Sequence, residues 1–321
     1  MIFKYLKHFL FTATSWALST NEDDILVGGQ AVIEGVMMRS PKGYSVAVRR
    51  QDGTVRVMKD ALLALGHKSK IFKAPVVRGV GVLAQALVLG IRALRFSAEE
   101  ALSEEITNKD AKKAAPKDPA QVSSWLIAGN LVLALGINVL LFVALPLLMT
   151  RLLQTQIGFH SSLLFNGIDG LLRVMVFVAF LYSVSWMKDM KRVFEYHGAE
   201  HKTVYNFESR QSLNVATAQK FSTLHPRCGT SFLLVVMIVS ILVFSVVHFD
   251  TFAGKLLSRI VLLPLVAGIS YEIIRYSAKH PNSVLRIVTL PGLLLQKITT
   301  KPPDDTQVEI AIRALEEALT V

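Results

Sequence analysis

The sequence is poor in cysteine and in charged residues. Cys228 is the one cysteine among 321 residues, which excludes an intrachain disulfide framework. Only 18% of the residues are charged and 52% are hydrophobic, whereas soluble domains average about 25% charged. Neither a G-x-G-x-x-G nor a Walker sequence is present, and the lack of an internal repeat disfavours an inverted-repeat transporter. This composition excludes disordered and fibrous proteins. Without disulfides, the fold must be stabilised by packing, by a bilayer or by a bound metal.

Long apolar runs are the main feature that is present, and the mean hydropathy is +0.44. A membrane-spanning helix needs about 20 apolar residues. Four segments meet this length: 125–149, 163–187, 229–249 and 256–276. The predicted fold is a mainly α membrane protein with about four transmembrane helices, plus a small cytoplasmic α+β portion that contains a short antiparallel sheet and interfacial helices.

Basic residues predict the orientation of these spans. The formal net charge is +11, from 35 Lys and Arg against 24 Asp and Glu. Lys and Arg concentrate before the first span, between the second and third, and after the fourth, whereas the two short loops carry only Arg151 and Lys255. The positive-inside rule then predicts that both termini are cytoplasmic, with the basic surface facing anionic lipid headgroups. No recognition helix or stacking platform accompanies the charge, so nucleic acid is not an expected partner.

The segments outside the spans have distinct patterns. Residues 1–26 predict an amphipathic N-terminal helix. Residues 27–97 predict a β-rich region, with a hairpin turn at Asp52-Gly53 and a re-entrant or surface-lying helix at 79–91. Residues 98–124 predict a linker, because Lys, Ala and Pro replace the apolar pattern. Gly28, Gly29 and Gly35 are expected to be turn glycines.

The remaining two segments are the bundle and the tail. Residues 125–276 form the four-helix region and include a cytoplasmic loop at 188–228. The tail, 277–321, predicts an interfacial segment around Pro291-Gly292 and a final helix capped by Asp304 or Asp305. Apolar residues at helical spacing in that helix predict docking onto the cytoplasmic domain.

The loop 188–228 contains a motif with a defined chemistry. His197 and His201 are four residues apart, so on a helix their imidazoles lie on one face, and Glu200 falls within the same arc. H-x-x-E-H is the inverted zinc-hydrolase order, in which two histidines bind the metal and the glutamate is the general base. Glu200 is therefore the candidate catalytic residue.

A second element, HPRC, supplies two further candidate ligands. Pro226 predicts a turn before the third span, which would bring His225 and Cys228 towards the two helical histidines. Four protein ligands, His197, His201, His225 and Cys228, would close a structural site, whereas three would leave a catalytic position open. Thiolate with imidazole favours zinc, with iron next. The ligands can meet only if the chain bends near Gly198 or the second span ends near residue 190.

An alternative without a metal site stays open, in which the histidines are interfacial polar caps and the cysteine is a small buried apolar residue. Asp169 and Arg173 are expected to pair within the second span. Glu272 is expected either to face the cluster or to pair with an arginine. The other residues predicted near the site or its substrate, by topology alone, are Arg275, Glu34, Arg39 and His280.

Four blocks carry a family resemblance: 28–39 (GGQAVIEGVMMR), 195–208 (EYHGAEHKTVYNFE), 225–232 (HPRCGTSF) and 290–305 (LPGLLLQKITTKPPDD). In these blocks the chain resembles the YqhQ-like bacterial membrane protein family, a domain of unknown function often labelled as metal-dependent enzymes. The resemblance covers about 28–318. It implies a multi-pass protein of the bacterial inner membrane and supports the HGAEH and HPRC positions, but it supplies no reaction.

Two functions follow as hypotheses. The first is a metal-dependent hydrolase, with zinc as cofactor, acting on a membrane-associated substrate from the cytoplasmic side. The second is a non-catalytic assembly or scaffold protein with a structural zinc site. A channel or transporter is weaker, because four spans could form a pore only as a homo-oligomer.

Overall fold

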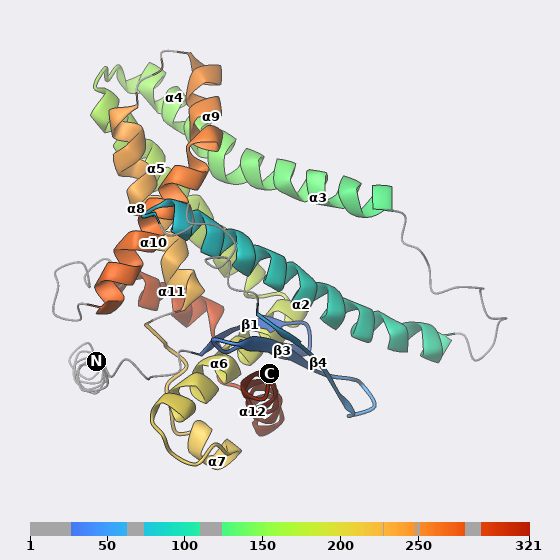
Figure 1. Ribbon diagram of the computed structural model, residues 1–321. Helices are drawn as coiled ribbons and strands as arrows, with labels where there is room; N and C mark the ends of the chain where they lie inside the picture. The colour runs from blue at the N-terminus through green and yellow to red at the C-terminus, as the bar shows by residue number, and fades with distance from the viewer. Residues whose placement is uncertain are drawn as a thin grey trace.

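The computed structural model describes residues 27–62, 74–109, 124–226, 228–247, 249, 251–279 and 290–321. Within them a bundle of apolar helices stands on a small sheet flanked by three helices (Figure 1). The mainly α architecture with an added sheet is as predicted. The predicted N-terminal helix and His280 lie outside the described residues.

The sheet is antiparallel with strand order β1-β2-β3-β4. Its strands are β1 (Gly28–Val32), β2 (Gly35–Arg39), β3 (Gly43–Arg49) and β4 (Val55–Ala61), and Gly53 makes the predicted turn with a φ of +84°. Gly28, Gly29 and Gly35 are strand residues, so their assignment to turns was wrong. At Gly35 and Gly29 a Cβ would meet the backbone of the neighbouring strand, which is why glycine is needed there.

The bundle contains the predicted spans with altered ends. The first is α3 (Ser124–Val139), a π-helical turn η3 (Leu140–Ala144) and α4 (Leu145–Ile157); the second and third are α5 (Ser162–Val184) and α8 (Gly229–Val246). The fourth is broken into α9 (Phe252–Val261) and α10 (Leu263–Lys279), which meet at 48°. By length and composition, four described helices could cross a membrane, or up to five if the bent pair is one span.

The helix α2 (Val77–Lys109) is one of the four described single helices that could cross a membrane. It is much longer than the 13-residue re-entrant or surface-lying helix predicted at 79–91. The predicted linker is also helical as far as Lys109. The helix is long because one of its faces packs on the sheet: Leu89 and Ala93 are buried against strand residues, and Phe96 packs beside them. The N-terminal end of α2 packs on α10, where Gly79 lies against Tyr271. The helix thus joins the bundle to the sheet.

The remaining helices are α6 (Lys188–Glu208), α7 (Val215–Ala218), α11 (Leu290–Thr299) and α12 (Asp305–Leu319). Of these, α6 and α12 pack on the sheet, α7 packs on α6 and α12, and α11 packs on α8 and α5. Asp304, one of the two residues predicted as N-cap, caps α12, and it forms a capping box with Gln307. Val308 and Leu315 of α12 are buried against the sheet and α6. The C-terminal helix therefore docks on the rest of its own domain, as predicted.

Within the bundle, Asp169 pairs with Arg173 one turn along α5, at 3.2 Å, as predicted. The same carboxylate oxygen also accepts a 2.8 Å hydrogen bond from Arg259 of α9. Arg259 is buried and reaches Asn166 as well. This ion cluster ties α5 to the broken fourth span.

Candidate metal centre

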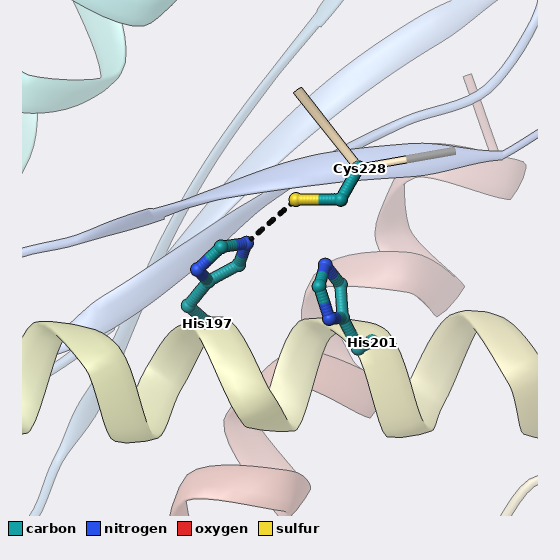
Figure 2. Close-up of side chains that lie close together, drawn as sticks. All are labelled: His197, His201 and Cys228. Carbon is teal, nitrogen blue, oxygen red and sulfur yellow. Dashed lines mark hydrogen bonds between the residues drawn. The ribbon is translucent and has the colours of Figure 1, made fainter. Parts of the chain in front are cut away.

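The motif histidines lie on α6, which starts after a break in the chain. α5 ends at Val184, residues 185–187 form a turn, and α6 begins at Lys188. The bend required by the sequence is therefore at this turn and not at Gly198. His197 and His201 project from one face of α6, with ring centroids 4.4 Å apart, and Cys228 faces them (Figure 2). His197, His201 and Cys228 each offer one ligand atom, and these atoms lie within 4.8 Å of one another.

Backbone contacts set the orientation of both imidazoles. His197 Nδ1 is 2.8 Å from the carbonyl oxygen of Thr299, and His201 Nδ1 contacts the carbonyl oxygen of Thr223. A carbonyl can only accept, so Nδ1 of each ring carries the proton and Nε2 carries the lone pair. Ligating histidines in metalloproteins characteristically donate their other N–H in this way. Both Nε2 lone pairs are directed into the space shared with Cys228.

These lone pairs support a metal centre. His197 Nε2 lies 3.1 Å from Cys228 Sγ, so a proton or a cation must lie between the two acceptors. His201 is buried, and among the described residues its Nε2 has no hydrogen-bond partner. Leaving a buried polar atom without a partner costs about 1–3 kcal/mol, and coordination would remove that cost. The donor set of two imidazoles and one sulfur fits zinc.

Cys228 is positioned by the turn that precedes α8. Its backbone N–H donates to the His225 carbonyl at 3.3 Å, as expected for the HPRC turn. Cys228 is also the N-cap of α8, and its sulfur lies 3.5 Å from the Thr230 nitrogen and 3.2 Å from the Thr230 hydroxyl. These contacts hold the sulfur at the N-terminus of α8, on the side that faces His197.

Glu200 lies beside the three candidate ligands. Its Oε2 is 3.9 Å from His197 Nε2 and 3.6 Å from His201 Nε2, and its side chain is buried. The chain of β1 passes directly over it: a Cβ at Gly29 would lie 2.9 Å from Glu200 Cγ. The carboxylate is thus held close to both imidazoles.

His225 is the predicted ligand that the structure does not bring into this group. Its Nε2 lies 3.7 Å from Glu208 Oε2, and its ring centroid is 5.6 Å from that of His201. Complete burial lowers the pKa of His225 to about 4, so the ring is neutral at physiological pH. Its position beside Tyr205, at 4.5 Å between ring centroids, is that of a packed neighbour of the site.

Glu272 is also away from the group. It pairs with Arg78 of α2, whose Nε donates to Oε1 at 2.7 Å, and it accepts the backbone N–H of Val76 at 3.3 Å. Pairing with an arginine was the alternative that the sequence left open. Glu272 therefore joins α2 to α10, and Arg275 lies on the same helix, outside the three-residue group.

Glu34 and Arg39, the two candidates from the N-terminal part of the chain, belong to the sheet, and Glu34 contacts α6. Glu34 occupies the β1–β2 turn with a φ of +51° and forms a two-point ion pair with Arg192 of α6. Tyr196 donates to the same carboxylate at 3.4 Å, and burial raises the pKa of that phenol. Arg39 ends β2, opposite Gly28 and Tyr44 in the ladder. Neither Glu34 nor Arg39 is in the three-residue group.

Sequence reasoning missed several residues that fix the site. Thr223 and Thr299 act through backbone carbonyls, which leave no signal in side-chain type. Gln296, fully buried on α11, contacts the backbone of His225. One signal was available for it: Gln296 is the polar residue at the end of the apolar run LPGLLLQ.

Comparison with known proteins agrees with the resemblance in the sequence blocks. The profile of the family described as protein of unknown function (DUF1385) matches residues 74–321. The chain belongs to the DUF1385 family. This DUF1385 protein is also 33% identical over 300 residues to the uncharacterized protein YqhQ of Bacillus subtilis (strain 168), covering 91% of this chain and 92% of that protein. No solved structure matches the chain.

Proposed function

We propose that this DUF1385 protein is a metal-dependent hydrolase of the bacterial inner membrane that acts on a membrane-associated substrate. The observation that carries the proposal is the convergence of two oriented imidazoles, one sulfur and a buried carboxylate. Three protein ligands with a position left for a fourth group are characteristic of catalytic zinc sites. His197, His201 and Cys228 would hold the metal.

The residues around the metal have separate roles in such a reaction. Zinc, when bound, would supply a Lewis acid that polarises the bond to be cleaved. Glu200 takes a proton from water as the water oxygen bonds to the carbonyl or phosphoryl centre, and returns it to the leaving group. The carbonyls of Thr299 and Thr223 keep both imidazoles in the tautomer that binds metal.

The position of the site supports a substrate from the membrane. Cys228 is the cap of α8, one of the helices long and apolar enough to cross a bilayer. The site is therefore at the end of a span, on the side of the sheet. We infer that this side is cytoplasmic, because Lys and Arg concentrate in its segments. Anionic headgroups are the expected contacts of these basic residues.

A structural zinc site is the second candidate, and one observation favours it. The three ligand residues come from two elements, α6 and the cap of α8, so a bound metal would cross-link the sheet domain to the bundle. In that case Glu200 would complete the shell or only pack against it, and no chemistry would depend on its charge.

Replacing Glu200 by Gln separates the two functions, because it keeps the shape and removes the base. The zinc-loaded protein is incubated with a total lipid and peptide extract of bacterial membranes, and products are identified by mass spectrometry as gain of water. A hydrolase yields such products with the wild type and with Glu195→Gln, a control on the same helix, but not with Glu200→Gln. Equal product patterns from all three proteins would contradict the enzyme and favour the structural site.

A further inference from the structure

The helix α11 touches both segments that carry candidate ligands. Gln296, at its centre, makes two hydrogen bonds to one residue of the HPRC turn: its Oε1 accepts the His225 N–H at 2.7 Å, and its Nε2 donates to the His225 carbonyl at 2.8 Å. The Gln296 side chain is completely buried, so no water competes for these bonds.

The same contacts determine where the sulfur of Cys228 lies. The His225 carbonyl that receives the Gln296 amide also receives the Cys228 N–H, at 3.3 Å. The Gln296 amide further donates to Ser231 Oγ in the first turn of α8, at 3.2 Å. One side chain therefore fixes the residue before the turn and the helix after it, with Cys228 between them.

The C-terminal end of α11 fixes the orientation of a second candidate ligand, His197. Thr299 is its last residue, and its carbonyl accepts the Nδ1 proton of His197. The chain can approach α6 this closely because position 198 is glycine: a Cβ there would clash with the Lys301 carbonyl. Lys301 then donates its backbone N–H to Phe194 of α6 at 2.9 Å.

A glycine also allows α11 to lie against α8. A Cβ at Gly292 would come within 2.6 Å of the Ser231 Cα, so any larger residue must push the two helices apart. Gly292 follows Pro291 in an apolar run, and its small size keeps Gln296 within reach of the HPRC turn.

From these contacts we propose that α11 positions the metal ligands, with Gln296 as the positioning residue for Cys228 and the Thr299 carbonyl for His197. The inference rests on the proposed metal centre for its function, but the effect on Cys228 is independent of metal. It predicts that metal affinity and thiol reactivity depend on a side chain that is not itself a ligand.

The test uses Gln296→Met, which keeps the volume and removes both hydrogen bonds to His225. Because Cys228 is the one cysteine of the chain, its alkylation rate in metal-free full-length protein reports directly on the turn. Cobalt(II) titration, followed by the thiolate-to-cobalt absorption band, reports on the assembled site. Gln307→Met is the matched control, since Gln307 is equally buried but hydrogen-bonds to Asp304 and Glu195.

We expect Gln296→Met to change the alkylation rate several-fold and to lower cobalt affinity by about 10–100-fold, with Gln307→Met like the wild type. Gly292→Ala should act in the same direction while every hydrogen-bonding group is retained, and it replaces Gln296→Met if that variant does not fold. Wild-type values for both α11 variants would overturn the proposal. A wild type that binds no cobalt would instead refute the metal centre, and the alkylation rates would still test the positioning.

Discussion

At the scale of single residues, neighbouring groups fix the orientation of each side chain in the candidate metal centre. In His197 and in His201, Nδ1 donates a hydrogen bond to a backbone carbonyl and Nε2 faces Cys228. Glu200 is confined by its burial and by the strand that passes at Gly29. The side chains are therefore held in position before any metal or substrate arrives, which is the condition for precise chemistry.

Gly29 tests how tightly Glu200 is confined. A Cβ at this position would lie 2.9 Å from Glu200 Cγ and would clash with the Met37 carbonyl, whereas a Cβ at Gly28 would meet nothing within 4 Å. We expect Gly29→Ala to cost about 1–3 kcal/mol of stability, and Gly28→Ala to cost much less. Apparent unfolding temperatures in detergent measure both, and equal temperatures would show that β1 does not press on Glu200.

His225 predicts the pH dependence of stability. Burial lowers its pKa from 6.5 to about 4, so the folded state binds fewer protons than the unfolded state between these values. Stability is therefore complete above pH 6.5 and falls as the pH drops towards 4, by at most about 3 kcal/mol. Unfolding temperatures of chelator-treated protein at pH 7.5 and pH 5 measure the effect. His225→Asn should reduce the difference; an unchanged difference would assign the loss to other groups.

At the scale of elements, what the sequence predicts well is what depends on local pattern. The hairpin at Asp52-Gly53, the N-cap of α12 and the i, i+4 histidines on α6 all follow from residues close in the chain. The length of α2 does not, because the helix continues past Arg92 where Ala93 and Phe96, like Leu89 before it, pack against strand residues.

The differences between the predicted and the observed arrangement of the site have the same origin. His225 and Cys228 share one turn, and spacing alone does not show that the Nε2 of His225 lies beside Glu208 while Cys228 faces α6. Gln296 and Thr299 reach the site from α11, about 70–100 residues along the chain from their partners. Contacts of that range depend on tertiary packing, which a single sequence does not reveal.

The junction of α2 with α10 is a further test at this scale. Arg78 and Glu272 form its ion pair, beside the contact of Gly79 with Tyr271. We expect Arg78→Glu to lower the unfolding temperature through repulsion of Glu272, and the double exchange Arg78→Glu with Glu272→Arg to recover most of the loss. A double variant no better than the single one would contradict the pairing.

At the scale of the whole molecule, the apolar and the chemical parts meet at one boundary. The bundle ends where the cap of α8, α6 and α11 come together, with the sheet and α12 beyond (Figure 1). The proposed hydrolase, with its site at this boundary, would receive a substrate from the bilayer and water from the other side. The basic residues of the flanking segments favour a cytoplasmic location for it.

Labelling of introduced cysteines tests this orientation, because Cys228→Ser yields a cysteine-free background. His160→Cys, in the α4–α5 loop, should react with a membrane-impermeant maleimide in intact cells. Ser212→Cys, between α6 and α7, should react only after permeabilisation. The reverse pattern would place the sheet and the candidate centre outside the cell.

The metal content of the full-length protein, purified in detergent and chelator-free buffer, tests the proposed metal centre most directly. We expect about one zinc per chain in the wild type and in His225→Ala. His197→Ala, His201→Ala and Cys228→Ala should each lose most of it, at unchanged helix content by circular dichroism. Wild-type protein with less than about 0.2 zinc or other divalent metal per chain would contradict the metal centre.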